Sequence, residues 1–198
     1  MNTATCLRAA VVASLVWSWS ATSAVAQDRL HVAGGDVTVV CPLTVGGSFE
    51  ARTKALSGDV GPAPQQAGGV GGALLVKLDT LETGIGLRDH HMRENYLEVE
   101  KGRGYDVATI ENIQLEKADG KGTFKATLLL HGQKRQVTGT SIVHRRGDGT
   151  THVDAEFPLK VSEFEIPKPT YLGVGVRDEI RVKVAFNALP MSTTASTR

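Results

Sequence analysis

Apolar and polar residues alternate with a period of two along much of this chain, and this pattern limits the folds that it can adopt. In residues 153–157 and 180–186 every second residue is apolar, and most residues between are charged. Successive side chains of a strand point to opposite faces, so each run predicts a β-strand with one apolar and one solvated face. Six further strands, about eight in all, are expected at 37–41, 45–52, 73–78, 106–115, 123–130 and 134–144.

Glycine-containing links separate several of these runs. They lie at 119–122, 131–134 and 147–149, and links of this length join antiparallel neighbours. An eight-stranded antiparallel sheet closed on itself has an interior about large enough for one small ligand. The sequence therefore predicts an all-β fold with one or two short helices, an eight-stranded up-and-down, lipocalin-like barrel. A two-sheet sandwich, which the same pattern would produce, is the alternative.

The first 26 residues have the composition of a secretory signal peptide. Arg8 precedes an apolar run at 9–17, and small residues end in Ala24-Val25-Ala26 before Gln27. The apolar run is shorter than the roughly 20 residues that span a bilayer. We expect a signal peptide at 1–26, one barrel domain at 27–189 and a disordered tail at 190–198. The mature protein is then periplasmic or secreted and has no integral membrane segment.

The charges of the mature chain balance. Of the 22 basic residues only Arg8 lies in the leader, which leaves 21 against 21 acidic residues. No basic run occurs, so nucleic-acid binding is not expected. Cys41 is the only cysteine after residue 26 and has no basic sequence neighbour, which favours packing as a small hydrophobe over redox chemistry. We expect no cofactor. The sequence does not decide between a monomer and a homodimer.

Residues 57–72 interrupt the alternation. They are rich in Gly, Pro, Ala and Gln and have no apolar periodicity. This composition predicts a mobile surface loop between two strands. The fragment before it is too short to fold alone, so we do not expect a domain boundary there.

The most specific pattern spans residues 79–97. It reads Asp-Thr-Leu-Glu-Thr-Gly at 79–84, Leu-Arg-Asp-His-His-Met-Arg at 87–93 and Tyr-Leu at 96–97. Met92, Tyr96 and Val99 fall at i, i+4 and i+7, which predicts a short amphipathic helix. We expect Asp89 to cap this helix through its side-chain oxygen. Arg88 would then pair with an acid such as Glu82 or Asp79, or alternatively reach a polar head group at the mouth of a pocket.

This ordered pattern resembles the signature of the YceI-like family, in which an acidic and Thr-Gly strand ending leads into an Arg-Asp-x-x-[Leu/Met] helix start. Residues 47–49, 124–137, 161–166 and 175–180 are also similar to segments of that family. The resemblance implies a lipocalin-type barrel that holds a long isoprenoid or similar lipid, and hence a carrier rather than a catalyst. Residues 96–105 depart from it, because they lack the family's aromatic-rich passage and its proline.

The inward faces of the expected barrel supply the candidate ligand-binding residues. They are mainly aliphatic, and only five phenylalanines occur in the chain, which leaves room inside. A buried methylene contributes about 0.8 kcal/mol, so one isoprene unit contributes on the order of 4 kcal/mol before ordering costs. We expect a long-chain isoprenoid or a fatty amphiphile as the ligand. The expected ligand-binding residues are Leu74, Val76, Leu78, Leu128, Leu130, Val153, Ala155, Phe157, Val182, Val184 and Phe186, together with Arg88.

Other chemistries find less support. Adjacent histidines on a helix, such as His90 and His91, point about 100° apart and do not readily share an ion with His131, His144 or His152. No Gly-x-Ser-x-Gly elbow exists for a serine nucleophile. We therefore expect no metal and no enzyme activity. Two alternatives stay open: an interaction module with a filled core that uses the 57–72 loop or the helix, and an enzyme that acts on an amphipathic substrate.

Overall fold

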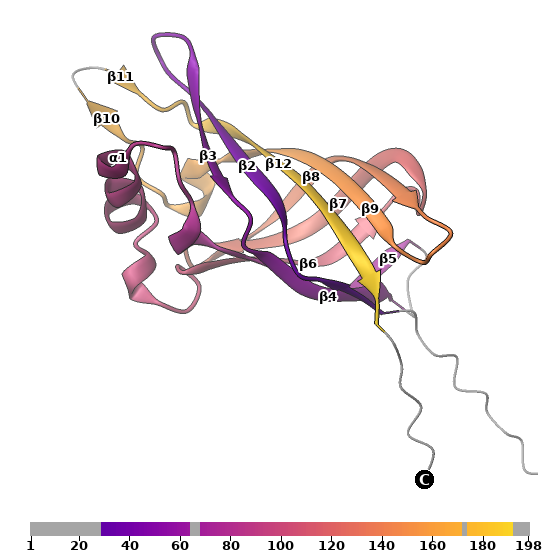
Figure 1. Ribbon diagram of the computed structural model, residues 1–198. Coiled ribbons are helices and arrows are strands. Elements are labelled where there is room, and N and C mark those ends of the chain that lie inside the picture. The colour runs from indigo at the N-terminus through magenta and orange to yellow at the C-terminus, as the bar shows by residue number, and fades with distance from the viewer. Residues whose placement is uncertain (1–28, 64–67, 172–173, 192–198) are drawn as a thin grey trace, which may run out of the picture.

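The computed structural model describes residues 29–63, 68–171 and 174–191 (Figure 1). The predicted signal peptide and its cleavage site, and residues 192–198 of the predicted tail, lie outside these ranges. The helical elements are η1 (Leu78–Thr80), α1 (Gly86–His91), η2 (Met92–Tyr96), η3 (Val99–Lys101) and η4 (Val161–Phe164). The strands are β1 (Leu30–Val32), β2 (Gly35–Pro42), β3 (Ser48–Thr53), β4 (Leu56–Pro62), β5 (Gly69–Lys77), β6 (Val107–Leu115), β7 (Gly120–Leu130), β8 (Gln133–Arg145), β9 (Thr151–Lys160), β10 (Thr170–Tyr171), β11 (Val174–Gly175) and β12 (Glu179–Pro190).

The strands close into an antiparallel barrel in which neighbours in sequence are neighbours in space. The first of the eight strand positions in the ring is filled by two short strands in succession, β1 and then β2. The second position is filled in the same way by β3 and β4. β5, β6, β7, β8, β9 and β12 complete the ring, and β12 pairs with both β2 and β1. This arrangement confirms the predicted eight-stranded up-and-down barrel, and the sandwich alternative is wrong. β12 extends to Pro190, which is paired with Leu30.

The turn between β7 and β8 shows how local sequence sets the strand pairing. His131 and Gly132 are the two central residues, with φ of 50° and 73°. Positive φ at both positions is the geometry of a tight hairpin turn that matches the twist of the flanking strands. The predicted link at 131–134 is thus confirmed, and the turn also carries a buried histidine.

The predicted loop at 57–72 is wrong, because most of it is strand. β4 and β5 form a hairpin across this segment, in register from Leu56↔Val76 to Pro62↔Val70. A Cβ at Gly58 would lie 2.1 Å from the carbonyl oxygen of Ala73, and one at Gly72 would lie 2.0 Å from that of Asp59. The glycines therefore permit close approach of two strands, which is a recognised role of strand glycine.

One end of the barrel is filled. Val32, Leu74 and Phe186 are buried there, and the rings of Phe124 and Phe157 meet edge to face at a centroid distance of 6.0 Å. A Cβ at Gly139 would lie 2.7 Å from the side chains of both phenylalanines. Glycine at this position lets the two rings seal this end of the interior.

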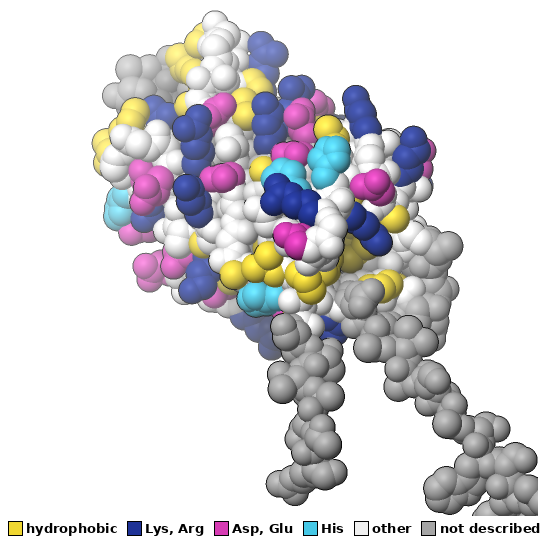
Figure 2. Space-filling view, turned by 45° about the vertical axis from the view of Figure 1, so that its right-hand side comes forward, with side chains coloured by type: hydrophobic (Ala, Val, Ile, Leu, Met, Phe, Trp, Pro, Cys, Tyr) yellow, Lys and Arg dark blue, Asp and Glu magenta, His cyan; other side chains and the backbone are white. Residues whose placement is uncertain are grey.

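The other end carries the helical segment. Figure 1 shows α1 beside β10–β11, near the tip of the β2–β3 hairpin. Backbone hydrogen bonds of 2.8 and 2.9 Å between Arg52 and Glu82 fix the chain before α1 against β3. No helix in the described ranges combines the length and hydropathy that crossing a bilayer requires. Figure 2 shows basic and acidic side chains interspersed over the face in view, without a patch of one sign.

Candidate functional site

The barrel is hollow at the end covered by the helical segment. The cavity there has a volume of about 1170 Å³ and an almost entirely apolar lining. Its walls come from β2, β3, β5 to β7, β9 and β12, and the segment between β5 and β6 covers it. Wall residues include Val39, Cys41, Val76, Ala108, Ile110, Leu128, Leu130, Leu159, Val161, Ile180 and Val182.

Eight of the twelve predicted ligand-binding residues line this cavity. They are Val76, Leu78, Leu128, Leu130, Phe157, Val182, Val184 and Arg88. Leu74 and Phe186 belong to the buried core, and Val153 and Ala155 pack against it, without lining the cavity. Period-two alternation predicts which face a side chain takes, but it does not predict how far along the barrel axis the residue lies.

None of the predicted ligand-binding residues lies on β2, although this strand supplies part of the cavity wall. Val37, Val39 and Cys41 of this strand line the cavity, and so does Leu43, just after its end. Residues 37–41 were predicted as a strand, and taking every second residue of that strand would have found the first three. Ile166, Pro167 and Pro169, between η4 and β10, and Thr170 of β10 also line the cavity, and no periodic signal marks them.

The helical segment presents both polar and apolar groups to the cavity. Arg88, His91 and Asn95 line it alongside Met92 and Tyr96. The segment is less regular than predicted, because the six-residue α1 runs into a π turn closed by the Leu97 N–H to the Met92 carbonyl, 2.9 Å. Of the predicted apolar helix face, Met92 and Tyr96 line the cavity, whereas Val99 packs against the core without lining it.

Asp89 does not cap α1. The N-cap residue is Ile85, and no side chain caps the helix. The Asp89 carboxylate instead accepts hydrogen bonds from the backbone N–H and the hydroxyl of Thr83, at 2.7 and 2.6 Å. Burial acts to raise the pKa of this carboxyl, but the Thr83 bonds, with Arg93 and Arg88 nearby, outweigh burial and lower it. Asp89 thus fastens the turn before α1 to the helix.

Arg88 does not form the predicted ion pair with Glu82 or Asp79. Its guanidinium lies 4.4 Å from the centroid of the Phe49 ring on β3, a cation–π contact. Arg93, on the same segment, donates to the carbonyl oxygen of Leu81 at 3.2 and 3.0 Å. The two arginines hold the helical segment over the cavity in different ways.

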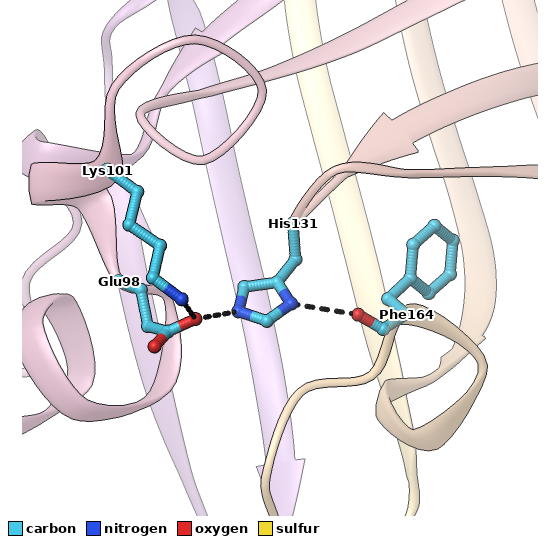
Figure 3. Close-up of polar contacts among 4 residues, drawn as sticks. All are labelled: Glu98, Lys101, His131 and Phe164. Carbon is cyan, nitrogen blue, oxygen red and sulfur yellow. Dashed lines mark hydrogen bonds and ion pairs between the residues drawn. The ribbon is translucent and has the colours of Figure 1, made fainter.

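A polar cluster around the buried His131 fixes the C-terminal part of this cover (Figure 3). His131 Nδ1 lies 3.0 Å from the carbonyl oxygen of Phe164, and its Nε2 lies 3.0 Å from Oε2 of Glu98. Lys101 donates to the same Glu98 oxygen at 2.7 Å. This bond is the main cause that lowers the pKa of the Glu98 carboxyl; desolvation opposes it, and His131 adds to the lowering. The cluster links η3, the β7–β8 turn and η4, and it does not line the cavity.

The histidines do not converge on a metal. His131 is engaged as above, His90 pairs with Glu94 at 2.9 Å, and His152 contacts Asn187 at 2.9 Å. Among the residues that the structure describes, no three His, Cys, Asp or Glu side chains are grouped so that they could hold an ion. Cys41 faces the cavity, and burial raises the pKa of its thiol to about 11, against a smaller lowering effect of Arg88.

Comparison with solved structures places this fold among known proteins. A polyisoprenoid-binding domain from Saccharophagus degradans, implicated in plant cell wall breakdown, superposes with a TM-score of 0.63 at 18% identity, covering 83% of this chain and 99% of that one. BcnA from Burkholderia cenocepacia gives 0.63 at 19% identity, covering 77% and 95%. The YCEI protein of Campylobacter jejuni gives 0.56 at 18% identity, covering 74% and 87%. At these identities the likeness shows a shared fold.

The family itself is established by sequence. No curated protein matches the chain. The sequence model of the YceI-like domain, however, matches residues 23–188 of the 198. The match covers the segment over the cavity and all of the barrel strands except the last two residues of β12. This chain therefore belongs to the YceI-like family.

Proposed function

We propose that this protein is a non-catalytic carrier that holds a polyisoprenoid-like or other long apolar molecule inside its barrel. The cavity is the observation that carries the proposal. Its volume of about 1170 Å³ exceeds the roughly 300–1,000 Å³ that is typical of small-molecule sites. Its aliphatic walls favour a hydrocarbon, because each methylene moved out of water contributes about 0.8 kcal/mol.

The cavity also separates this proposal from the alternatives. A filled-core interaction module fits only the end sealed by Phe124 and Phe157, since the other end is hollow. An enzyme would need an acid, base or nucleophile with partners facing the ligand. Of the groups lining the cavity, the Cys41 thiol has a raised pKa and is a poor nucleophile at neutral pH. Membership of a family with a polyisoprenoid-binding relative adds support.

We place the carrier in the periplasm or outside the cell. Support comes from the leader at 1–26, with its small residues before Gln27. The intact mass of protein recovered from a periplasmic fraction tests this, with a start at Gln27 expected. A species that retains Trp17 and Trp19 would contradict it.

Binding is tested with delipidated protein and farnesol as a neutral isoprenoid ligand, which displaces a neutral fluorescent probe such as N-phenylnaphthylamine. Saturable displacement with one site per chain is expected. Failure of both the probe and farnesol to bind a folded protein would refute the carrier proposal.

A further inference from the structure

The basic and amide side chains that line the cavity come from its helical cover. Arg88, His91 and Asn95 lie at i, i+3 and i+7 and line the cavity together. The strands opposite contribute mostly aliphatic side chains. Among the described lining residues there is one Arg and no Lys, Asp or Glu. The site thus combines a long apolar interior with a single fixed positive charge at one end.

The Arg88 guanidinium keeps N–H donors with which it can bind a ligand. Its guanidinium carbon lies over the Phe49 ring, 4.4 Å from the ring centroid, and a cation–π contact of this kind does not pair the N–H groups with a hydrogen-bond acceptor. Within the described ranges, the Arg88 side chain has no hydrogen-bond acceptor or ion-pair partner in contact. A guanidinium at an apolar wall is suited to a carboxylate or phosphate, which it can bind through two parallel hydrogen bonds.

The acids close to Arg88 are already engaged. Asp89 accepts two hydrogen bonds from Thr83 and has Arg93 nearby as well as Arg88. Glu94 pairs with His90 on the outer side of the helix. Two arginines around one buried carboxylate leave a surplus of one positive charge beside the cavity.

We propose that the stripe of Arg88, His91 and Asn95 recognises an acidic head group, a carboxylate or a phosphate monoester, on the apolar ligand. This inference rests on the proposed carrier function and specifies the ligand class. The head group lies against the helical cover, and the tail runs toward Leu128, Phe157 and the sealed end. A neutral head group forgoes the charge-assisted hydrogen bonds of Arg88, and a cationic one is repelled by it.

The test compares four ligands that share one tail: farnesoic acid, farnesyl monophosphate, farnesol and farnesylamine. Each displaces the neutral probe from delipidated protein at pH 7.5 in low salt. We expect the acid or the phosphate to bind at least about tenfold more tightly than farnesol, and farnesylamine to bind most weakly. The stronger of the first two identifies a carboxylate or a phosphate as the preferred head group, and either result supports the inference.

Variants of Arg88 assign the preference. Arg88→Gln should reduce the ratio of acid to alcohol affinity to within about twofold; a general effect of the substitution on the cavity changes both affinities alike and cancels in this ratio. Arg88→Lys should restore part of the ratio, because it keeps the charge but not the bidentate geometry. His90→Ala is the matched control, since His90 is on the same helix but does not line the cavity. It should leave the ratio unchanged.

Three results would overturn the inference. One is equal affinity for all four ligands in the wild-type protein, and another is an acid preference that survives Arg88→Gln undiminished. In both cases normal farnesol binding would leave the carrier function standing. The third is a lack of binding by any of the four, farnesol included, which would remove the carrier function as well.

Discussion

Replacing Ala108 by tryptophan should expel ligand from the cavity while leaving the barrel folded. Ala108 lies on β6, is paired with Val76 of β5, and both residues line the cavity. A tryptophan side chain covers roughly 150–250 Å². If it displaces ligand contact over that area, the loss at about 25 cal/mol per Å² is about 4 to 6 kcal/mol. A ligand can shift within so large a cavity, so we expect farnesol affinity to fall at least about a hundredfold.

Thr109→Trp is the matched control. Thr109 is the next residue of β6 and does not line the cavity, whereas its neighbours Ala108 and Ile110 do. Its side chain therefore takes the outer face, and farnesol affinity should stay within about threefold of wild type. In protein that starts at Gln27 the new tryptophan is the only one. Its emission should be blue-shifted at position 108 relative to position 109.

Thermal unfolding and probe displacement are measured on both variants. Equal loss of binding in two folded variants would contradict the interior site. So would full binding in Ala108→Trp with its tryptophan shown to be buried.

Three further predictions concern packing and titration. Gly139→Ala should lower the free energy of unfolding by about 1–3 kcal/mol through overpacking, because the new Cβ would lie 2.3 Å from the Glu156 carbonyl oxygen. Gly147→Ala is the control, since its Cβ would meet nothing within 4 Å, and it should be nearly neutral in the same denaturant titration. Cys41, with a thiol pKa of about 11, should react slowly with a neutral maleimide at pH 8 and more slowly still with farnesol bound, and fast labelling of folded, ligand-bound protein would contradict this. The pKa of Asp89 is lower in the folded state, so its contribution to stability is present above the unfolded pKa of about 3.9 and is lost as the pH falls through the folded value. The stability difference between wild type and Asp89→Asn should therefore shrink from pH 7 to pH 3, and a constant difference would count against the Thr83 bonds as its source.

The strands could be predicted from the sequence because each buries one face against a common interior. On β9 and β12 the alternation places side chains such as those of Phe157 and Val182 inside the barrel, as expected. The position of a residue along the barrel axis was not predictable from the alternation. Ala155 and Ala108 have the same pattern, yet only Ala108 lines the cavity, since where the barrel is filled depends on long-range contacts such as that of Phe124 with Phe157.

Local rules failed where tertiary contacts decide the outcome. Glycines 58 and 72 were interpreted as loop residues, although they lie where two strands approach too closely for a Cβ. Asp89 was expected to cap a helix, but its carboxylate accepts bonds from Thr83 in the preceding turn. Arg88 was expected to pair with an acid, but its guanidinium lies over the ring of Phe49, which is distant in sequence. Sequence spacing alone contains no signal for such a contact.

The most direct test of the carrier function is to identify what the protein holds when it is made in cells. The protein is purified from a periplasmic fraction without detergent, its native mass is measured, and an organic extract is analysed by mass spectrometry beside an extract of Ala108→Trp. We expect about one lipid per chain with a long apolar tail in the wild-type protein, and little or none in the variant. A native mass equal to that of the bare chain, together with an extract that matches the variant's, would contradict the account.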